Sequence, residues 1–231
     1  MNREQTALVT GASKGIGLEV ARQLVERGWY VCLTARNLKA DKKTALTLRS
    51  SIHVVELDVT KQPSIERAVK EVSAAMDHLD VLVNNAGILE DGDDSVPTVD
   101  ADLLRRTLET NTLGPLMVTQ AFLPLLRKSR GARIVNVSST GGQLTGMGHW
   151  APAYSISKAA LNAVTGQFAA ALAPEKIAVN SVCPGWVRTD MGGCNAPRSV
   201  TQGADSIVWL ATEAPHELTG KFIQDRKVID W

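Results

Sequence analysis

Two kinds of hydrophobic pattern alternate along the chain. Short apolar runs that end in glycine or polar residues are typical of buried strands, and longer stretches with an apolar residue every three or four positions are typical of helices. The sequence predicts strands at 6–10, 29–35, 52–57, 79–83, 133–137, 177–182 and 222–229. It predicts helices at 18–27, 38–48, 64–76, 100–126, 159–172 and 200–211, with a break at Gly114-Pro115 in the longest one.

The regular order of strands and helices predicts right-handed crossovers, which place the strands parallel to one another with helices on both faces. This order indicates the α/β class and a single-domain Rossmann fold, with a doubly wound, mostly parallel sheet of seven strands. No linker, repeat or low-complexity segment divides residues 1–231, so one domain is expected. In such a sheet the carboxyl ends of the strands share one edge, where ligands bind.

Composition excludes some functions. The 231 residues include 25 Lys and Arg against 24 Asp and Glu, so the net charge of +1 gives no reason to expect a nucleic acid or an anionic membrane as partner. Three cysteines and four scattered histidines lack the spacing of a disulfide framework or a metal site. With no signal-like or membrane-spanning stretch, a cytoplasmic protein is expected.

A glycine-rich loop follows the first strand. Gly11, Gly15 and Gly17 stand between that strand and the helix that begins near Leu18. Glycines allow the backbone to approach a pyrophosphate closely, and the N-terminus of the following helix supplies N–H groups and a positive dipole. The strand, the loop and the helix together predict a dinucleotide-binding unit.

The end of the second strand indicates which dinucleotide is bound. NAD-binding domains place Asp or Glu about 20 residues after the glycine loop, but this strand ends Thr34-Ala35-Arg36-Asn37. Arg36 stands where a 2′-phosphate would lie, and Lys14 belongs to the glycine loop. Because a guanidinium binds phosphate well, NADP(H) is favoured over NAD(H). Either cation taken alone could be an ordinary surface residue.

Polar or small residues follow the next two strands. Asp58 could meet an adenine amino group or could cap a turn, and Asn84-Asn85-Ala86-Gly87 would leave room for a cofactor. The acidic loop at 88–99 is expected to be solvated, although it could rim a substrate cleft. Asn111, just before the break in the long helical stretch, could satisfy a local bond or could distort the helix and hold a water.

The candidate chemistry lies at the start of the alanine-rich helix. Tyr154 and Lys158 are four residues apart and would share one helical face. A cation within about 4–5 Å favours phenolate and lowers the tyrosine pKa from about 10, which suits a general acid or base for carbonyl chemistry. Ser139 follows the fifth strand and could hydrogen-bond a substrate carbonyl oxygen. Taken alone, the pair could be an ordinary helix start, and Ser139 could be part of a turn.

Two other functions fit parts of the sequence. Gly11-Ala-Ser13-Lys-Gly15 also matches the nucleophile elbow of serine hydrolases, which needs an acid and then a histidine downstream. His216 is the only histidine near the C-terminal end, and it stands in a turn-like segment, which disfavours this interpretation. A non-catalytic NADP-binding sensor or scaffold on the same fold is the second alternative. The complete set of candidate catalytic residues argues against it, because a sensor need not retain them.

Six motifs occur in order over the whole chain: Thr10-Gly-Ala-Ser-Lys-Gly-Ile-Gly17, Asn84-Asn-Ala-Gly87, Asn111, Ser139, Tyr154-x-x-x-Lys158 and Pro184-Gly185. As a set they resemble the short-chain dehydrogenase/reductase superfamily. The chain looks most similar to NADPH-dependent carbonyl reductases, and the resemblance is carried by 14–24, Ala35-Arg36-Asn37, 184–191 and the ending in Trp231. It implies reduction of a ketone or aldehyde to an alcohol, with NADP(H) as cofactor and a small molecule as substrate.

The resemblance also implies a role for each site residue. Tyr154 would donate a proton to the carbonyl oxygen, and Ser139 would hydrogen-bond that oxygen. Lys158 would lower the pKa of Tyr154 and contact the nicotinamide ribose, Asn111 would hold a water in a proton relay, and Thr189 would bind the carboxamide. The residues expected to bind the cofactor are Gly11, Ser13, Lys14, Gly15, Ile16, Gly17, Arg36, Asp58, Val59, Asn85, Ala86, Gly87, Tyr154, Lys158, Pro184, Gly185, Val187 and Thr189.

The length of one segment bears on assembly. Some carbonyl reductases carry a long insertion before the tyrosine that covers a helical face and keeps them monomeric. Here the segment is short, and the helix after Lys158 is rich in alanine, which permits close helix approach. The resemblance therefore implies a homodimer or homotetramer built on this face.

Overall fold

The computed structural model describes residues 4–36 and 52–231, so the helix expected at 38–48 lies outside the described residues. The first half contains β1 (Thr6–Val9), α1 (Gly15–Glu26), β2 (Tyr30–Ala35), β3 (Ile52–Glu56), α3 (Gln62–Ala75), β4 (Val81–Asn84), α4 (Ala101–Leu108) and α5 (Gly114–Leu126). The second half contains β5 (Arg133–Val137), α6 (Pro152–Leu172), β6 (Ala178–Val182), α7 (Val200–Thr212), β7 (Phe222–Gln224) and β8 (Lys227–Ile229).

The strands form one sheet in the order β3-β2-β1-β4-β5-β6-β7-β8. All neighbours pair in parallel except β7 and β8, which are antiparallel. The α/β class and the doubly wound, mostly parallel sheet are confirmed, but the expected count of seven strands is wrong. The last predicted strand folds back on itself at Asp225-Arg226, where both residues have positive φ (49° and 60°). Such a two-residue hairpin turn usually has Asn, Asp or Gly followed by Gly, but here Arg226 takes the second position, so the usual glycine signal is absent.

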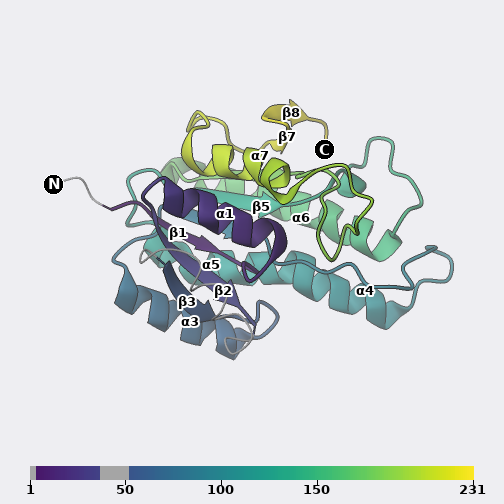
Figure 1. Ribbon diagram of the computed structural model, residues 1–231, viewed down its shortest axis with the longest axis horizontal. Helices are drawn as coiled ribbons and strands as arrows, with labels where there is room; N and C mark the ends of the chain where they lie inside the picture. Colours follow the sequence, from purple (N-terminus) through teal and green to yellow (C-terminus); the bar gives the residue numbers. More distant parts are fainter. Residues whose placement is uncertain (1–3, 37–51) are drawn as a thin grey trace.

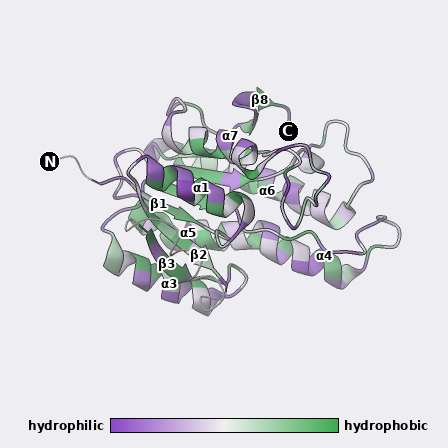
Figure 2. Cartoon of the chain, viewed as in Figure 1, coloured by the Kyte–Doolittle hydropathy of each residue, from purple (hydrophilic) through white to green (hydrophobic). Residues whose placement is uncertain are grey.

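Two hydrophobic cores lie on opposite faces of the sheet (Figures 1 and 2). Alternate residues of β1 point to different cores: Ala7 and Val9 pack with α1 and α7, whereas Leu8 packs with α3, α5 and α6. Figure 1 shows α1 and α7 together on one face of the sheet. Within the described ranges, no helix has both the length and the apolar character that crossing a bilayer requires.

The long helical stretch is interrupted near the expected break. A π-helical turn at Glu109–Leu113 separates α4 from α5, and it contains Asn111. Gly114 follows this turn, and a Cβ on it would lie 2.8 Å from Cγ2 of Val59. Glycine therefore lets α5 approach the loop that follows β3. The π-turn and this close approach place Asn111 beside the carboxyl edge of the sheet.

Candidate active site

The carboxyl ends of the parallel strands open into a cleft of about 1360 Å³. Three of the expected site residues, Gly15, Gly17 and Asn111, do not line this cleft. The other expected site residues do: Gly11, Ser13, Lys14, Ile16, Arg36, Asp58, Val59, Asn85, Ala86, Gly87, Ser139, Tyr154, Lys158, Pro184, Gly185, Val187 and Thr189. The topology thus brings residues from separate loops and helices, far apart in the sequence, to one site.

The glycine loop is tightly packed against the end of β4. Asn85 Nδ2 donates to the carbonyl oxygens of Thr10 (2.9 Å) and Gly11 (3.1 Å). A Cβ on Gly17 would lie 2.4 Å from that same Nδ2 and 2.7 Å from the Gly11 oxygen. Gly15 has φ +59°, and a Cβ there would lie 3.3 Å from Cγ2 of Thr189. Side chains at Gly15 and Gly17 would prevent the backbone of this loop from turning so tightly. The tight turn without side chains fits a pyrophosphate, which backbone N–H groups bind at a helix N-terminus.

The cations at this end of the cleft fit a dinucleotide with a 2′-phosphate. Arg36 is exposed at the end of β2, and no residue in the described ranges forms an ion pair with it. Lys14 forms an exposed ion pair with Asp190, across the mouth of the glycine loop. Asp58 accepts hydrogen bonds from the backbone and hydroxyl of Thr60 at 3.0 and 2.7 Å. Asp58 therefore caps a turn, one of the two roles considered for it, while still lining the cleft.

Tyr154 and Lys158 lie side by side on the first turns of α6. Lys158 is 4% exposed, and its Nζ lies 5.5 Å from the centroid of the Tyr154 ring. The Nζ donates a hydrogen bond of 2.8 Å to the carbonyl oxygen of Val137, the last residue of β5. Trp150 packs edge-on against the Tyr154 ring, with the centroids 5.8 Å apart. The ammonium is thus held beneath the cleft rather than in solvent.

Burial controls the protonation of both groups. Burial raises the pKa of Tyr154 to about 12, although a hydrogen bond with Ser139 acts in the opposite direction. Burial lowers the pKa of Lys158 to about 8. For the chain by itself, removal from water thus disfavours the phenolate more than the surroundings favour it, and the lowering of the Tyr154 pKa by Lys158 stays a prediction. Tyr154 keeps its proton at neutral pH.

Ser139 lies at the tip of β5, within hydrogen-bonding reach of Tyr154. Its Oγ accepts a bond of 3.1 Å from the backbone N–H of Gly141, which fixes the hydroxyl at the start of a short 3-10 turn. Cys183 also lies here: its Sγ accepts hydrogen bonds from the backbones of Thr140 (3.3 Å) and Gly185 (3.4 Å). The thiol links the loops that follow β5 and β6 and lines the cleft.

Asn111 is fully buried and uses its whole amide within the protein. Its Oδ1 accepts from the N–H of Ile88 at 2.8 Å, and its Nδ2 donates to the oxygen of Ile88 at 2.9 Å and to Oγ of Ser157 at 3.0 Å. A Cβ on Gly87 would lie 3.3 Å from Oδ1 of Asn111 and 3.5 Å from Nζ of Lys158. Of the roles considered for Asn111, the local hydrogen bonds and the distorted helix are both observed.

The acidic loop contributes one residue that sequence reasoning missed. Asp93 is 8% exposed, and its carboxylate accepts hydrogen bonds from the backbones of Ala153 and Tyr154. The expectation of a solvated loop is therefore wrong at Asp93, while Leu89 and Glu90 do line the cleft. No sequence signal joins residues 60 positions apart, so only the fold shows this contact.

The serine hydrolase alternative fails on geometry. Ser13 follows the carboxyl end of β1 and lines the cleft. His216 instead lies against Gly131, which precedes the amino end of β5, with a distance of 3.4 Å from its Nε2 to a Cβ built there. Since the strands are parallel, these two residues lie at opposite edges of the sheet and cannot form a catalytic pair.

Known proteins resemble this chain in both sequence and structure. Residues 5–198 match the family model for short chain dehydrogenases. The short-chain dehydrogenase anuI of Penicillium roqueforti is 36% identical, over 96% of this chain and 94% of the relative. The carbonyl reductase [NADPH] 1 of Sus scrofa is 32% identical, over 98% of this chain and 94% of the relative. The crystal structure of NADPH-bound carbonyl reductase from chicken fatty liver superposes with a TM-score of 0.91 and 29% identity, over 99% of this chain and 100% of that one.

Proposed function

The chain belongs to the short-chain dehydrogenase family, and we propose that it reduces a ketone or aldehyde to an alcohol with NADPH, with Tyr154 as the proton donor. Family membership makes it an oxidoreductase of carbonyl or alcohol groups. The observation that carries the proposal is the buried Tyr154–Lys158 pair in the same cleft as Arg36. Arg36 follows β2 and Ser139 follows β5, three strand positions away, so the cleft crosses the sheet as an extended dinucleotide would.

The chain's own residues would bind and orient the reactants. NADPH would supply the hydride. The backbone of the glycine loop would bind the pyrophosphate at the N-terminus of α1, and Arg36 would pair with the 2′-phosphate. Thr189, next to Gly15, and Lys158 would hold the nicotinamide half. The NADPH-bound structure of the chicken carbonyl reductase supports this cofactor, since that protein has the same fold over its full length.

The proton transfer would follow from burial. Tyr154 is protonated at neutral pH, because the ordinary tyrosine pKa is about 10 and burial raises it further, to about 12. Its hydroxyl would donate this proton to the carbonyl oxygen as negative charge develops there, while Ser139 would donate a second hydrogen bond to that oxygen. As the phenol loses its proton, the nearby Lys158 ammonium would stabilise the phenolate. This attraction would be stronger in the transition state than in the ground state, because the negative charge develops there.

Asn111 would position the loop at Ile88, and its side-chain amide would not hold a relay water. Both protons of its amide are used by Ile88 and Ser157.

Removal of the Tyr154 hydroxyl tests this mechanism. Tyr154→Phe keeps the ring and its packing but removes the transferred proton, so turnover should fall by about 10²- to 10⁴-fold while NADPH binding stays measurable. The matched control is Tyr30→Phe, since the chain has 2 tyrosines. The assay follows NADPH oxidation with a panel of simple ketones, aldehydes and quinones. Turnover of the variant near the parent rate would show that the mechanism is wrong. NADPH binding without turnover of any carbonyl by the parent would favour the sensor.

Reversal of the charge at Arg36 tests the cofactor. Arg36→Asp replaces a cation that attracts a 2′-phosphate with an anion that repels it, and a carboxylate can hydrogen-bond ribose hydroxyls instead. The ratio of kcat/KM for NADPH to that for NADH should therefore fall. Arg27→Asp, on the exposed end of α1, is the control. An unchanged ratio would contradict the assignment of NADP(H).

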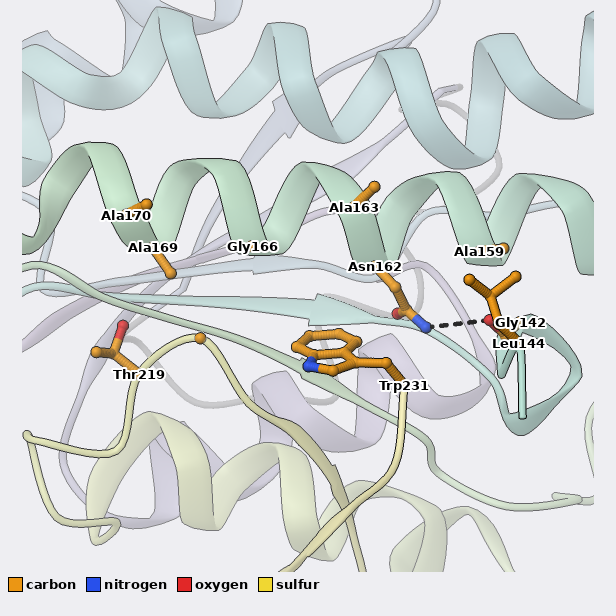
Figure 3. Close-up of a pocket in the computed structure, with 11 residues that line it drawn as sticks. Gly142, Leu144, Ala159, Asn162, Ala163, Gly166, Ala169, Ala170, Thr219 and Trp231 are labelled. Atoms are coloured by element: carbon orange, nitrogen blue, oxygen red, sulfur yellow. Dashed lines mark hydrogen bonds between the residues drawn. The ribbon is translucent and has the colours of Figure 1, made fainter.

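We further propose a homodimer or homotetramer through the exposed face of α6. Ala159, Ala163, Gly166 and Ala170 follow one another along this face and line a shallow groove of about 550 Å³. Figure 3 shows Trp231 across the groove from the helix. Small side chains allow a second helix to approach closely.

A further inference from the structure

Helix α6 begins without a cap from its own sequence. Its N-cap residue, Ala151, has left-handed backbone angles (φ 43°, ψ 68°) and no side chain that can accept a hydrogen bond. Pro152 follows and has no N–H, and Ser155 N–H already pairs with the oxygen of Ala151 at 2.8 Å. The N–H groups of Ala153 and Tyr154 therefore need an acceptor from elsewhere in the fold.

Asp93 is that acceptor. Its Oδ1 accepts from Ala153 N–H at 2.8 Å, and its Oδ2 accepts from Tyr154 N–H at 2.9 Å. The carboxylate is buried, and no cation in the described ranges forms an ion pair with it. Burial of an unpaired charge is unfavourable, so the two N–H groups and the positive end of the α6 dipole must compensate it. Asp93 is thus bonded directly to the backbone of the candidate proton donor.

The loop that carries Asp93 is held at a second point beside the active site. Asn111 binds both backbone groups of Ile88 where the loop leaves β4, so each of the two points is fixed by a pair of hydrogen bonds. Gly92, with φ +84°, makes the turn immediately before Asp93. Between the two anchors, Leu89 and Glu90 line the cleft. The loop therefore ties the cleft wall to the first turn of α6.

We propose that Asp93 is a positioning residue for the reduction: its carboxylate fixes the first turn of α6 and thereby holds the Tyr154 hydroxyl against Ser139. The inference rests on the proposed function, because it assigns a part in the same proton transfer. A proton donor must lie within hydrogen-bonding distance of the reacting oxygen, and a displacement of about 1 Å can lower a rate about 10²-fold. An ordinary helix cap would contribute to folding but would not affect this alignment.

Substitutions of Asp93 separate the two possibilities. Asp93→Ala removes both acceptors, and kcat should fall about 10- to 100-fold with little change in the KM for NADPH. Asp93→Asn keeps one acceptor oxygen and should recover part of the rate. The control, Asp94→Ala, changes an exposed acid in the same loop and should behave as the parent. A kcat of folded Asp93→Ala equal to that of the parent would overturn the proposal, as would a rise in the NADPH KM that accounts for the whole effect.

Ionisation of Tyr154 provides a readout that needs no turnover. In a Tyr30→Phe background Tyr154 is the only tyrosine. Its pKa, raised to about 12 by burial, leaves it protonated near pH 10, where an exposed phenol is about half ionised. If Asp93 holds the ring in place, Asp93→Ala should show phenolate absorbance near that pH, with Asp93→Asn intermediate and the circular dichroism unchanged. Parent-like absorbance in both variants would overturn the proposal, whether or not the parent reduces a carbonyl. Failure of the parent to reduce any carbonyl would instead refute the proposed function.

Discussion

Replacement of Asn111 with alanine should destabilise the protein and impair turnover together. The substitution removes three hydrogen bonds, two to the backbone of Ile88 and one to Ser157. Each such bond contributes about 1 kcal/mol net, and the partners left unsatisfied in a buried region add to the loss. We therefore expect a decrease of about 3–4 kcal/mol in the free energy of unfolding. For a chain of this size, that corresponds to a fall in Tm of about 6–16 °C.

The effect on turnover follows from the place of Ile88. Asn111 holds the loop beside Gly87, where a Cβ would lie 3.5 Å from Nζ of Lys158. Once Ile88 is released, the cleft wall next to the ammonium loses its support, so kcat should fall more than the NADPH KM rises. The assays are thermal unfolding followed by circular dichroism and steady-state NADPH oxidation.

Two variants make the test specific. Asn111→Asp keeps the acceptor for Ile88 N–H but loses both donors, so its Tm should lie between those of the parent and Asn111→Ala. Leu113→Ala, in the same π-turn but 47% exposed, should change neither Tm nor kcat appreciably. If Asn111→Ala unfolds at the parent temperature, its hydrogen bonds do not support the loop and the reasoning is refuted.

Three further predictions concern the cofactor loop, pH and assembly. Gly17→Ala would place a Cβ 2.4 Å from Nδ2 of Asn85, so the glycine loop must shift and the Kd for NADPH, measured by fluorescence titration, should rise; an unchanged Kd would contradict the role of this loop in cofactor binding. Burial lowers the pKa of Lys158 to about 8, so kcat for reduction should fall above about pH 8. The free energy of unfolding should instead rise from that pH toward 10.5, because the unfolded chain binds this proton more tightly. A kcat that is flat through this range would show that the charge of Lys158 is not needed. Gly166→Arg adds a side chain to a site where a Cβ meets nothing within 4 Å, so it should convert an oligomer to a folded monomer, as measured by light scattering. The control Ala74→Arg, on the exposed face of α3, should leave the oligomer intact. If Gly166→Arg has the mass of the parent, this face of α6 is not the interface.

Local patterns were enough to predict most of the elements and the edge where the site lies. Short apolar runs predict buried parallel strands because both faces of each strand are covered, and the structure has strands at every predicted position in the described ranges. The glycine loop and Arg36 could be placed at strand ends because right-handed crossovers bring all those ends to one edge. The order of the motifs alone indicated the family, which the comparisons confirm, and the resemblance named the candidate catalytic residues.

Contacts between distant residues were decided only by the tertiary structure. The reversal at Asp225-Arg226 carried no glycine signal, and the bonds from Asn111 to Ile88 and from Asp93 to Tyr154 join residues 23 and 61 positions apart. Burial also could not be predicted from the sequence. The spacing of Tyr154 and Lys158 predicts a lowered Tyr154 pKa, whereas the fold removes both groups from water, and burial raises the Tyr154 pKa. Sequence spacing determines which groups can share a helical face, whereas the pKa depends on how much water and which dipoles surround them. The order of motifs thus determined the kind of chemistry, and the packing around α6 determined the protonation state in which that chemistry would begin.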